Sequence, residues 1–384
     1  MKGKIILRGL LLCSTAFLLG GCANHEKDKT TATFSSSKPK TVIMAPQPKK
    51  PTHIQSQLTP EEANQLSDYL NKIHFSGTIL LVKNNKPVYA NAYGYANKKE
   101  NKKNKVDSTY QIASVQKFIT ATAILKLIEE GKLSFDDRLS QFYPDFPHGD
   151  QITIRQLLNM DSGLHLPNDK RPNKVYSSQD GYIKYYADTA TFYKSKKWNY
   201  EAVNYSILAG ILEKVTHKSY EKAIDNMIIK PLKLTNIGFV NAKHQPSNYS
   251  MGHTLQGADS PYVEKEYQYA REVGTGNMYS SAPTLYKLMS SVIQGKIISS
   301  ELFAQTHISP SGKRTYESGC YVQPTTYMSH GGGLGFDASV VISKDGKNAV
   351  IMLCNQAYKQ YMPNLANQIY EQLMNWTPQN KKAQ

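Results

Sequence analysis

The sequence predicts an α/β (α+β) fold, in which one antiparallel β-sheet is flanked by helices and a helical subdomain is inserted between its two parts. β-rich runs occur near both ends of the folded region, at residues 77–93 and 339–354. The long stretch between them is dominated by helical patterns, and it opens with a largely apolar segment at 112–130. Strands at both ends with helices between them are typical of a sheet assembled from both termini.

The N-terminal part of this fold begins near Leu58. The segment 59–62, Thr-Pro-Glu-Glu, supplies an N-cap, a proline for the first helical position and two acids for the first turn, which predicts a helix. The next two runs, 77–83 and 86–93, flank Asn84-Asn85 and predict a hairpin.

The central and C-terminal parts follow the same logic. Residues 112–130 are apolar on most sides and are closed by Gly131, which predicts a largely buried helix. The clearest helix of the inserted region is 203–215. Two apolar runs, 339–343 and 348–354, predict a second hairpin, and residues 365–373 predict a closing helix.

The N-terminus indicates export. Lys2, Lys4 and Arg8 form a positive region before an apolar stretch, 5–19, that is short for a membrane span. The segment Leu19-Gly20-Gly21-Cys22 resembles a bacterial lipobox. This resemblance implies cleavage before Cys22, a lipid on its thiol and a protein tethered to the extracellular face of the cell membrane. The alternative is an ordinary signal peptide followed by an incidental cysteine.

The same features divide the chain into segments. Residues 1–21 are the predicted signal peptide, and residues 22–57, which are rich in Lys, Thr, Ser, Pro and Gln, predict a flexible stalk behind the lipidated cysteine. Residues 58–376 form the predicted folded domain, and 377–384 a tail.

The chain is basic, with 46 Lys and Arg against 30 Asp and Glu. Its net charge of +16 becomes +13 once the three cations of residues 1–21 are excluded. A charge of this sign favours polyanionic surroundings. Nucleic acid is disfavoured as a partner, because the sequence has no Arg-rich run, zinc-finger spacing or basic heptad helix. A phosphate-rich cell envelope fits better.

Two further cysteines, Cys320 and Cys354, could form one bridge in an exported chain. Cys354 lies in an apolar run, 349–354, where the role of a small buried hydrophobe is favoured. No cysteine–histidine spacing suits a metal, and the sequence predicts neither a metal nor a cofactor.

Ser114 and Lys117 are the first candidates for catalysis. A serine hydroxyl needs a base to take its proton, and at this spacing the two side chains share one face of a helix. The spacing alone is weak evidence, since Ser35-x-x-Lys38 and Ser37-x-x-Lys40 repeat it in the predicted stalk. The position of Ser114 distinguishes it from these two serines. Lys117 falls on a helix that should be buried, and because burying a charged side chain costs free energy, its presence there indicates a function.

With these residues the chain resembles the serine β-lactamase and penicillin-binding-protein superfamily, in its class C-like branch, over about Gly77 to Gln372. Four segments carry the resemblance in the family's order besides the Ser-x-x-Lys pair. They are similar to the family's segment that usually reads Leu-Leu, His-Thr-Ser-Gly-Leu, its Tyr-x-Asn motif, its glycine-rich segment and its Lys-Thr-Gly or His-x-Gly motif. In this chain they stand at 151–164, 200–213, 274–280 and 330–336.

The resemblance implies roles for individual residues. Ser114 would be the acylated nucleophile, Lys117 its partner, Tyr200 a participant in proton transfer and His330 a group on the opposite wall of the pocket. Taken alone, Tyr200 has the ordinary interpretation of a packing residue and His330 that of a structural histidine.

The glycines after His330 also gain a role. Backbone amides of Ser114 and Gly333 would form the oxyanion hole, and Gly332 with its neighbours would let a substrate approach the strand. Two interpretations of Glu201 stay open: it attracts a substrate ammonium, or it is simply a solvated acid at the start of a helix.

Two departures from the family pattern narrow the substrate. Ala202 stands where the second motif has its Asn, and His330 replaces the lysine of the third. Both changes count against recognition of a peptide amide and a free carboxylate. They favour the teichoic acid D-alanyl esterases of this superfamily, whose substrate offers an ammonium, an ester and a polyphosphate chain.

The alternatives are a D-Ala-D-Ala carboxypeptidase acting on peptidoglycan-derived substrate, a β-lactamase or a generic esterase of the same fold. A non-catalytic protein that binds the envelope is a further alternative, against which the retention of Ser114, Lys117 and Tyr200 argues.

Overall fold

The computed structural model describes residues 58–194, 197–253, 265–308, 315–356, 358 and 361–375. The predicted signal peptide 1–21, Cys22, the stalk 22–57 and the tail 377–384 lie outside the described residues, so these assignments stay predictions. No helix among the described residues has the length and apolar character needed to cross a membrane.

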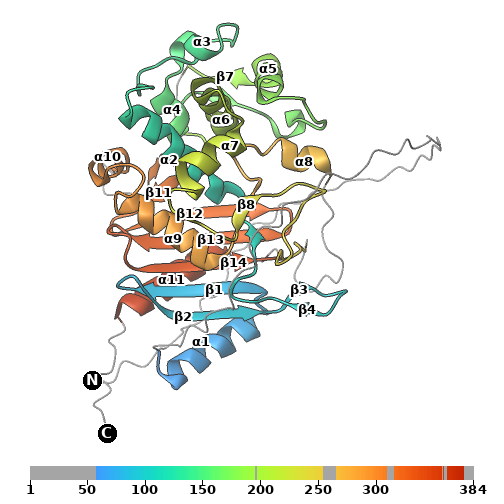
Figure 1. The fold of residues 1–384 in the computed structure, drawn as a ribbon, viewed down its shortest axis with the longest axis vertical. Coiled ribbons are helices and arrows are strands. Elements are labelled where there is room, and N and C mark those ends of the chain that lie inside the picture. The colour runs from blue at the N-terminus through green and yellow to red at the C-terminus, as the bar shows by residue number, and fades with distance from the viewer. Residues whose placement is uncertain are drawn as a thin grey trace, which may run out of the picture. The chain divides into compact units, whose positions relative to one another are not determined.

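A seven-stranded antiparallel sheet forms the centre of the fold (Figure 1). Strands from the two ends of the chain meet in it, because the first strand pairs with the last, Gly77 opposite Cys354. In spatial order the strands are β10 (Thr315–Glu317), β11 (Cys320–Val322), β12 (Thr326–Gly333), β13 (Phe336–Ser343), β14 (Ala349–Cys354), β1 (Gly77–Lys83) and β2 (Lys86–Tyr93). The two predicted hairpins are confirmed as β1–β2 and β13–β14.

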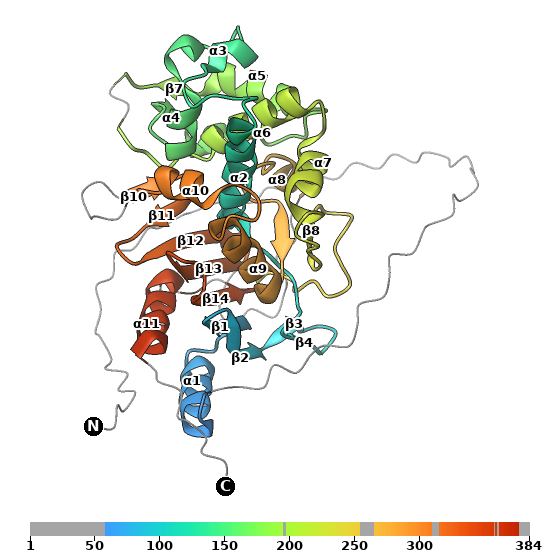
Figure 2. The ribbon, with the colours of Figure 1, turned by 60° about the vertical axis from the view of Figure 1, so that its left-hand side comes forward.

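Both faces of the sheet are covered by helices, which lie on either side of it in Figure 2. Along β14, Ala349, Ile351 and Leu353 enter the core shared with the helical region, while Val350, Met352 and Cys354 enter a second core with α1 and α11. This alternation follows from the two-residue period of a strand. The covering helices are α1 (Pro60–Lys72) and α11 (Met362–Asn375) on one face, and α2 (Gln116–Glu129) and α9 (Ala282–Ile293) on the other.

A helical region lies beyond α2, at the top of Figure 1. Its central helix, α6 (Val203–Thr216), contacts α2, α4, α5 and α7. The remaining helices are α3 (Leu139–Phe142), α4 (Ile154–Asn159), α5 (Gln179–Thr189), α7 (Tyr220–Ile224), α8 (Glu266–Ala270) and α10 (Ser300–Thr306), with single turns η1 (Ala113–Val115), η2 (Gly149–Gln151), η3 (Asn168–Lys170) and the π-helical η4 (Asp225–Ile229).

Three small sheets complete the part of the chain that the structure describes. They join β3 (Tyr95–Asn97) to β4 (Lys102–Lys103), β6 (Leu164–His165) to β7 (Thr191–Phe192), and β5 (Tyr110–Gln111) to β9 (Met278–Ser280) and β8 (Ile237–Phe239). The β5–β9 pairing matters for function, because it brings the residues just before Ser114 beside the glycine-rich segment 274–280.

The predicted fold class is confirmed, and so are the principal helices. Thr59 caps α1 through a reciprocal capping box with Glu62, and α6 and α11 contain the predicted helices 203–215 and 365–373 almost unchanged. The favoured role of Cys354 as a small buried hydrophobe is confirmed. Cys320 and Cys354 are free, buried thiols that belong to cores on opposite faces of the sheet, so the bridge that the sequence left open does not form.

Candidate active site

Ser114 lies in η1, one turn before α2. The preceding residue, Ala113, has a φ of +42°, a left-handed conformation that is costly for a residue with a side chain. This turn leaves Ser114 partly exposed while its neighbours are buried. Strain of this kind is typical of positions that a fold holds for function.

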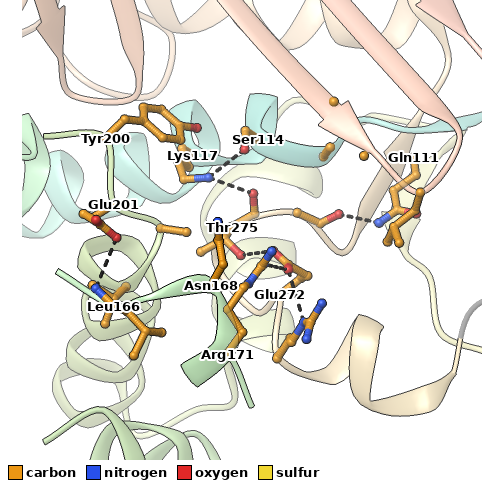
Figure 3. A pocket seen from close by; sticks show the side chains of 18 residues that line it. Gln111, Ser114, Lys117, Leu166, Asn168, Arg171, Tyr200, Glu201, Glu272 and Thr275 are labelled. Carbon is orange, nitrogen blue, oxygen red and sulfur yellow. Dashed lines mark hydrogen bonds and ion pairs between the residues drawn. The ribbon is translucent and has the colours of Figure 1, made fainter. Parts of the chain in front are cut away.

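Lys117 directs its amine at Ser114, as the sequence predicts (Figure 3). Its Nζ lies 2.8 Å from Ser114 Oγ, within hydrogen-bonding distance, and the side chain is only 1% exposed. It donates a second hydrogen bond, of 3.3 Å, to the carbonyl oxygen of Thr275. Among the described residues, no carboxylate lies within ion-pair distance of this amine.

The glycine-rich segment 274–278 is held against α2 by side chains of two neighbouring helical turns. The Gln116 side chain accepts from Met278 N at 2.8 Å and donates to Asn277 Oδ1 at 3.0 Å. One turn further on, Thr120 donates to the carbonyl of Gly274 at 2.8 Å. Lys117 therefore reaches its carbonyl partner within a segment that its own helix positions.

Tyr200 lies in the loop that leads into α6, and its ring faces Lys117. The amine is 5.2 Å from the ring centroid, and Figure 3 shows the phenol oxygen on the side of Ser114. Behind it, Tyr316 of β10 packs edge-on at 5.7 Å. Burial raises the pKa of Tyr316 well above its ordinary value, so this partner stays a neutral phenol. The predicted neighbourhood of Ser114, Lys117 and Tyr200 is observed.

β12 passes close to the nucleophile, and Gly331 makes this approach possible. A Cβ at Gly331 would lie 2.2 Å from the carbonyl oxygen of Ile112 and 2.6 Å from the amide nitrogen of Ser114. Any larger residue would push the strand away from η1. The close packing of β12 against η1 therefore requires glycine at position 331.

The turn after β12 decides which of its amides faces the pocket. Leu334 and Gly335 have φ angles of 57° and 80°, as a two-residue type I′ turn requires. The pair that closes such a turn, Gly333 with Phe336, exchanges backbone hydrogen bonds, so Gly332 points its N–H away from β13. Gly332 and Gly333 both line the pocket, but the outward amide is that of Gly332. The expectation that the Gly333 amide faces the pocket as an oxyanion donor therefore differs from the structure.

The expectation for His330 also differs from the structure. Its Nε2 lies 3.2 Å from Asp337 Oδ2, and its ring packs edge-on against Tyr361 at 5.2 Å. His330 does not line the pocket. Since neighbouring residues of a strand point to opposite faces, the approach of Gly331 to Ser114 sends His330 to the other face of the sheet.

Glu201 lines the pocket, but the interpretation as a solvated acid is wrong. Its side chain is 12% exposed and is hydrogen-bonded to His165 Nδ1, to Asn199 at 3.0 Å and to the amide of Leu166 at 3.4 Å. Ala202 also lines the pocket, at the N-cap of α6. The amide that the family has at this position is therefore absent from the pocket.

A charged wall of the pocket was not predicted. Arg171, which follows η3, and Arg271, at the end of α8, flank Glu272, and all three line the pocket with Asn168 and Gln111. The sequence offers little sign of these pocket residues. Arg171 stands in a loop without hydrophobic periodicity, and only Arg271 and Glu272 immediately precede a recognised motif, the glycine-rich segment 274–280. The whole cavity has a volume of about 330 Å³. Among the described residues, no group of His, Cys, Asp and Glu side chains is arranged to hold a metal ion.

Comparison with known proteins follows this geometry. The family model described as Beta-lactamase matches residues 66–373. PbpX of Bacillus subtilis, whose name describes it as a penicillin-binding protein, is 32% identical over 97% of this chain and 94% of its own length. Protein flp of Staphylococcus aureus is 28% identical over 80% of this chain, which spans only 64% of that protein.

Solved structures agree with this match. FmtA from Staphylococcus aureus has a TM-score of 0.72 and 25% identity, over 85% of this chain and 93% of FmtA. D-amino acid amidase from Ochrobactrum anthropi has a TM-score of 0.67 at 17% identity, over 82% of this chain and 97% of that one, which shows a shared fold.

Proposed function

Because the chain belongs to the β-lactamase and penicillin-binding-protein-like family of serine hydrolases, we propose that it removes D-alanyl esters from teichoic acids through an acyl-enzyme on Ser114. The observation that carries the proposal is the 2.8 Å contact between Ser114 and the buried amine of Lys117, in a pocket where Ala202 replaces an amide. Such a pocket supplies ester chemistry and lacks a partner for a peptide amide.

The reaction has two steps. Lys117, assisted by Tyr200, takes the Ser114 proton as Oγ bonds to the ester carbonyl carbon, and the carbonyl oxygen gains the negative charge. Backbone amides of Ser114 and Gly332 stabilise that oxygen. When the carbon–oxygen bond of the ester breaks, Tyr200 protonates the leaving polyol. Water then attacks the acyl-enzyme by the same route and releases D-alanine.

Charge and location support the choice of substrate. A chain of phosphates suits a protein of net charge +13 after residue 21. The lipobox-like Cys22 and the stalk 22–57 would hold the enzyme on the extracellular face of the membrane, where lipoteichoic acid is anchored. Glu201, which lines the pocket on the side of Tyr200 in Figure 3, is the carboxylate available for the alanyl ammonium.

The test incubates the purified protein with D-alanylated lipoteichoic acid and measures free D-alanine. We expect release by the wild type and none above background by Ser114→Ala. Absence of release by a folded wild type contradicts the esterase proposal. Equal release by both proteins would remove Ser114 from the mechanism.

The name of the PbpX relative favours one other candidate, a D-Ala-D-Ala carboxypeptidase or another penicillin-binding enzyme. Labelling with a fluorescent penicillin distinguishes the two. The esterase account predicts weak labelling, because neither Ala202 nor His330 supplies a side chain for an amide or a carboxylate. Stoichiometric labelling at Ser114 would favour the peptidase.

A further inference from the structure

We infer that Arg171 and Arg271, with Asn168, form a phosphate subsite that holds the phosphodiester next to the ester being cleaved. This inference rests on the proposed function and deepens it, because it names the part of the polymer that the cleft recognises. It starts from the charged wall that lines the pocket beside Ser114 (Figure 3).

The charges of this wall are unbalanced. Two guanidinium groups share one carboxylate: Arg171 Nη2 bonds to Glu272 Oε1, and Arg271 Nε lies 3.7 Å from the same oxygen. The other oxygen, Oε2, accepts a 2.6 Å hydrogen bond from Thr275 Oγ1. Glu272 therefore neutralises one cation and leaves one positive charge on the wall.

Arg171 is the arginine that a ligand can reach. Its side chain is 39% exposed, against 17% for Arg271, and a guanidinium offers five N–H donors in a planar fork. One nitrogen of Arg171 is engaged by Glu272, and the residue lines the pocket. A planar fork of this kind matches two oxygens of a phosphate.

The wall is held in place before any ligand binds. Arg271 donates to the carbonyl of Pro172 at 3.1 Å and faces the ring of Tyr267 at 5.5 Å, which joins the end of α8 to the loop after η3. Thr275 orients Glu272 through its hydroxyl and Lys117 through its carbonyl. Since these side chains are already ordered, an anion that binds here loses little free energy to ordering them.

The arrangement gives the cleft a direction. In Figure 3 Glu201 lies on the side of Tyr200, whereas Arg171 lies on a different side of the Ser114–Lys117 pair. A D-alanyl ester on a polyol phosphate has the matching order: ammonium, ester carbonyl, then phosphodiester. The subsite would therefore bind the phosphodiester of the leaving polyol, a group that a simple D-alanyl ester does not have.

Binding can be measured without turnover in the full-length Ser114→Ala protein. The probe is glycerophosphoglycerol, a phosphodiester of two glycerols, titrated by calorimetry at two salt concentrations. We expect saturable binding that weakens with salt. R171Q should weaken it by about tenfold or more, the scale of lost hydrogen bonds to a charged group.

Two further variants keep the result interpretable. R171Q also removes a partner of Glu272. N168D, which places a negative charge beside Arg171 at an exposed position, tests the subsite while both members of that pair are retained, and it should weaken binding by a similar factor. K170Q removes a neighbouring exposed cation that does not line the pocket, and it should leave the affinity unchanged.

If R171Q and N168D both bind the diester as tightly as the parent Ser114→Ala protein, with unchanged melting temperatures, the subsite is overturned. Tighter Arg171-dependent binding of inorganic phosphate or of acetyl-D-alanyl-D-alanine than of the diester also overturns it, because that result would assign the site to a free anion or a peptide carboxylate. Failure of the proposed function is a separate result, because it appears as absent D-alanine release by the wild type.

Discussion

Gly331 of β12 packs directly against the backbone amide of Ser114, and the space between them has no room for a methyl group: a Cβ at Gly331 would lie 2.6 Å from Ser114 N. The nucleophile and the strand that carries the second oxyanion donor are therefore held at a fixed separation.

Gly331→Ala should separate β12 from η1 and misplace the Gly332 amide relative to Ser114. Loss of one oxyanion donor costs about 10²- to 10³-fold in kcat, and we expect a loss of that order. Gly332→Ala should cost less, because the nearest atom to its Cβ is His330 Cε1 at 3.6 Å. Steady-state kinetics and a melting curve for each variant check this. A larger loss in Gly332→Ala than in Gly331→Ala would contradict it.

Lys117→Met replaces the buried amine with an apolar chain of similar length. Removal of a general base costs about 10²- to 10⁴-fold in rate, and we expect kcat to fall by that order while the melting temperature stays near that of the wild type. Lys126→Met is the matched control on the same helix, since Lys126 pairs with Glu130 outside the pocket. Similar losses in both variants would show an effect of helix α2 rather than of the amine.

Tyr200→Phe keeps the ring against Lys117 and Tyr316 but removes the hydroxyl. If that hydroxyl protonates the leaving polyol, the loss in kcat should be about 10²-fold and should shrink for esters with acidic leaving groups, which need no proton. Comparing glycerol and nitrophenyl esters measures this. An equal loss for both esters would show that the hydroxyl does not act on the leaving group, and no loss for either would assign Tyr200 to packing alone.

His307 should make the fold sensitive to acid. Burial lowers the pKa of His307 to about 4, so between pH 6.5 and 4 the unfolded chain binds a proton that the folded chain does not. The free energy of unfolding should therefore fall as the pH falls through this window, by about 3 kcal/mol in total.

Urea unfolding between pH 4 and 7 measures this slope. His307→Gln, which does not titrate, should reduce it, whereas the exposed His244→Gln should not. A slope that is unchanged in His307→Gln would show that other groups control acid unfolding.

Sequence reasoning was accurate where local signals decide structure. The hairpin at Asn84-Asn85 and the capped start of α1 depend on turn and cap residues that can be recognised in a single sequence. The contact between Ser114 and Lys117 could also be predicted, because one helical turn fixes the spacing of the two side chains.

Tertiary pairing decided the rest. The side to which His330 points depends on strand register, and that register is set by the Leu334–Gly335 turn, which lacks a strong turn sequence. The wall of Arg171, Arg271 and Glu272 joins two segments about 100 residues apart. No periodicity in either segment predicts that they come into contact.

Intact-protein mass spectrometry shows whether Ser114 carries the acyl group. The wild type is mixed with a D-alanyl ester of glycerol phosphate and quenched in acid within the first turnover. The account predicts a mass increase of one alanyl group, mapped by peptide digestion to Ser114 and absent from Ser114→Ala. D-alanine release without any such adduct, or an adduct on another residue, would contradict it.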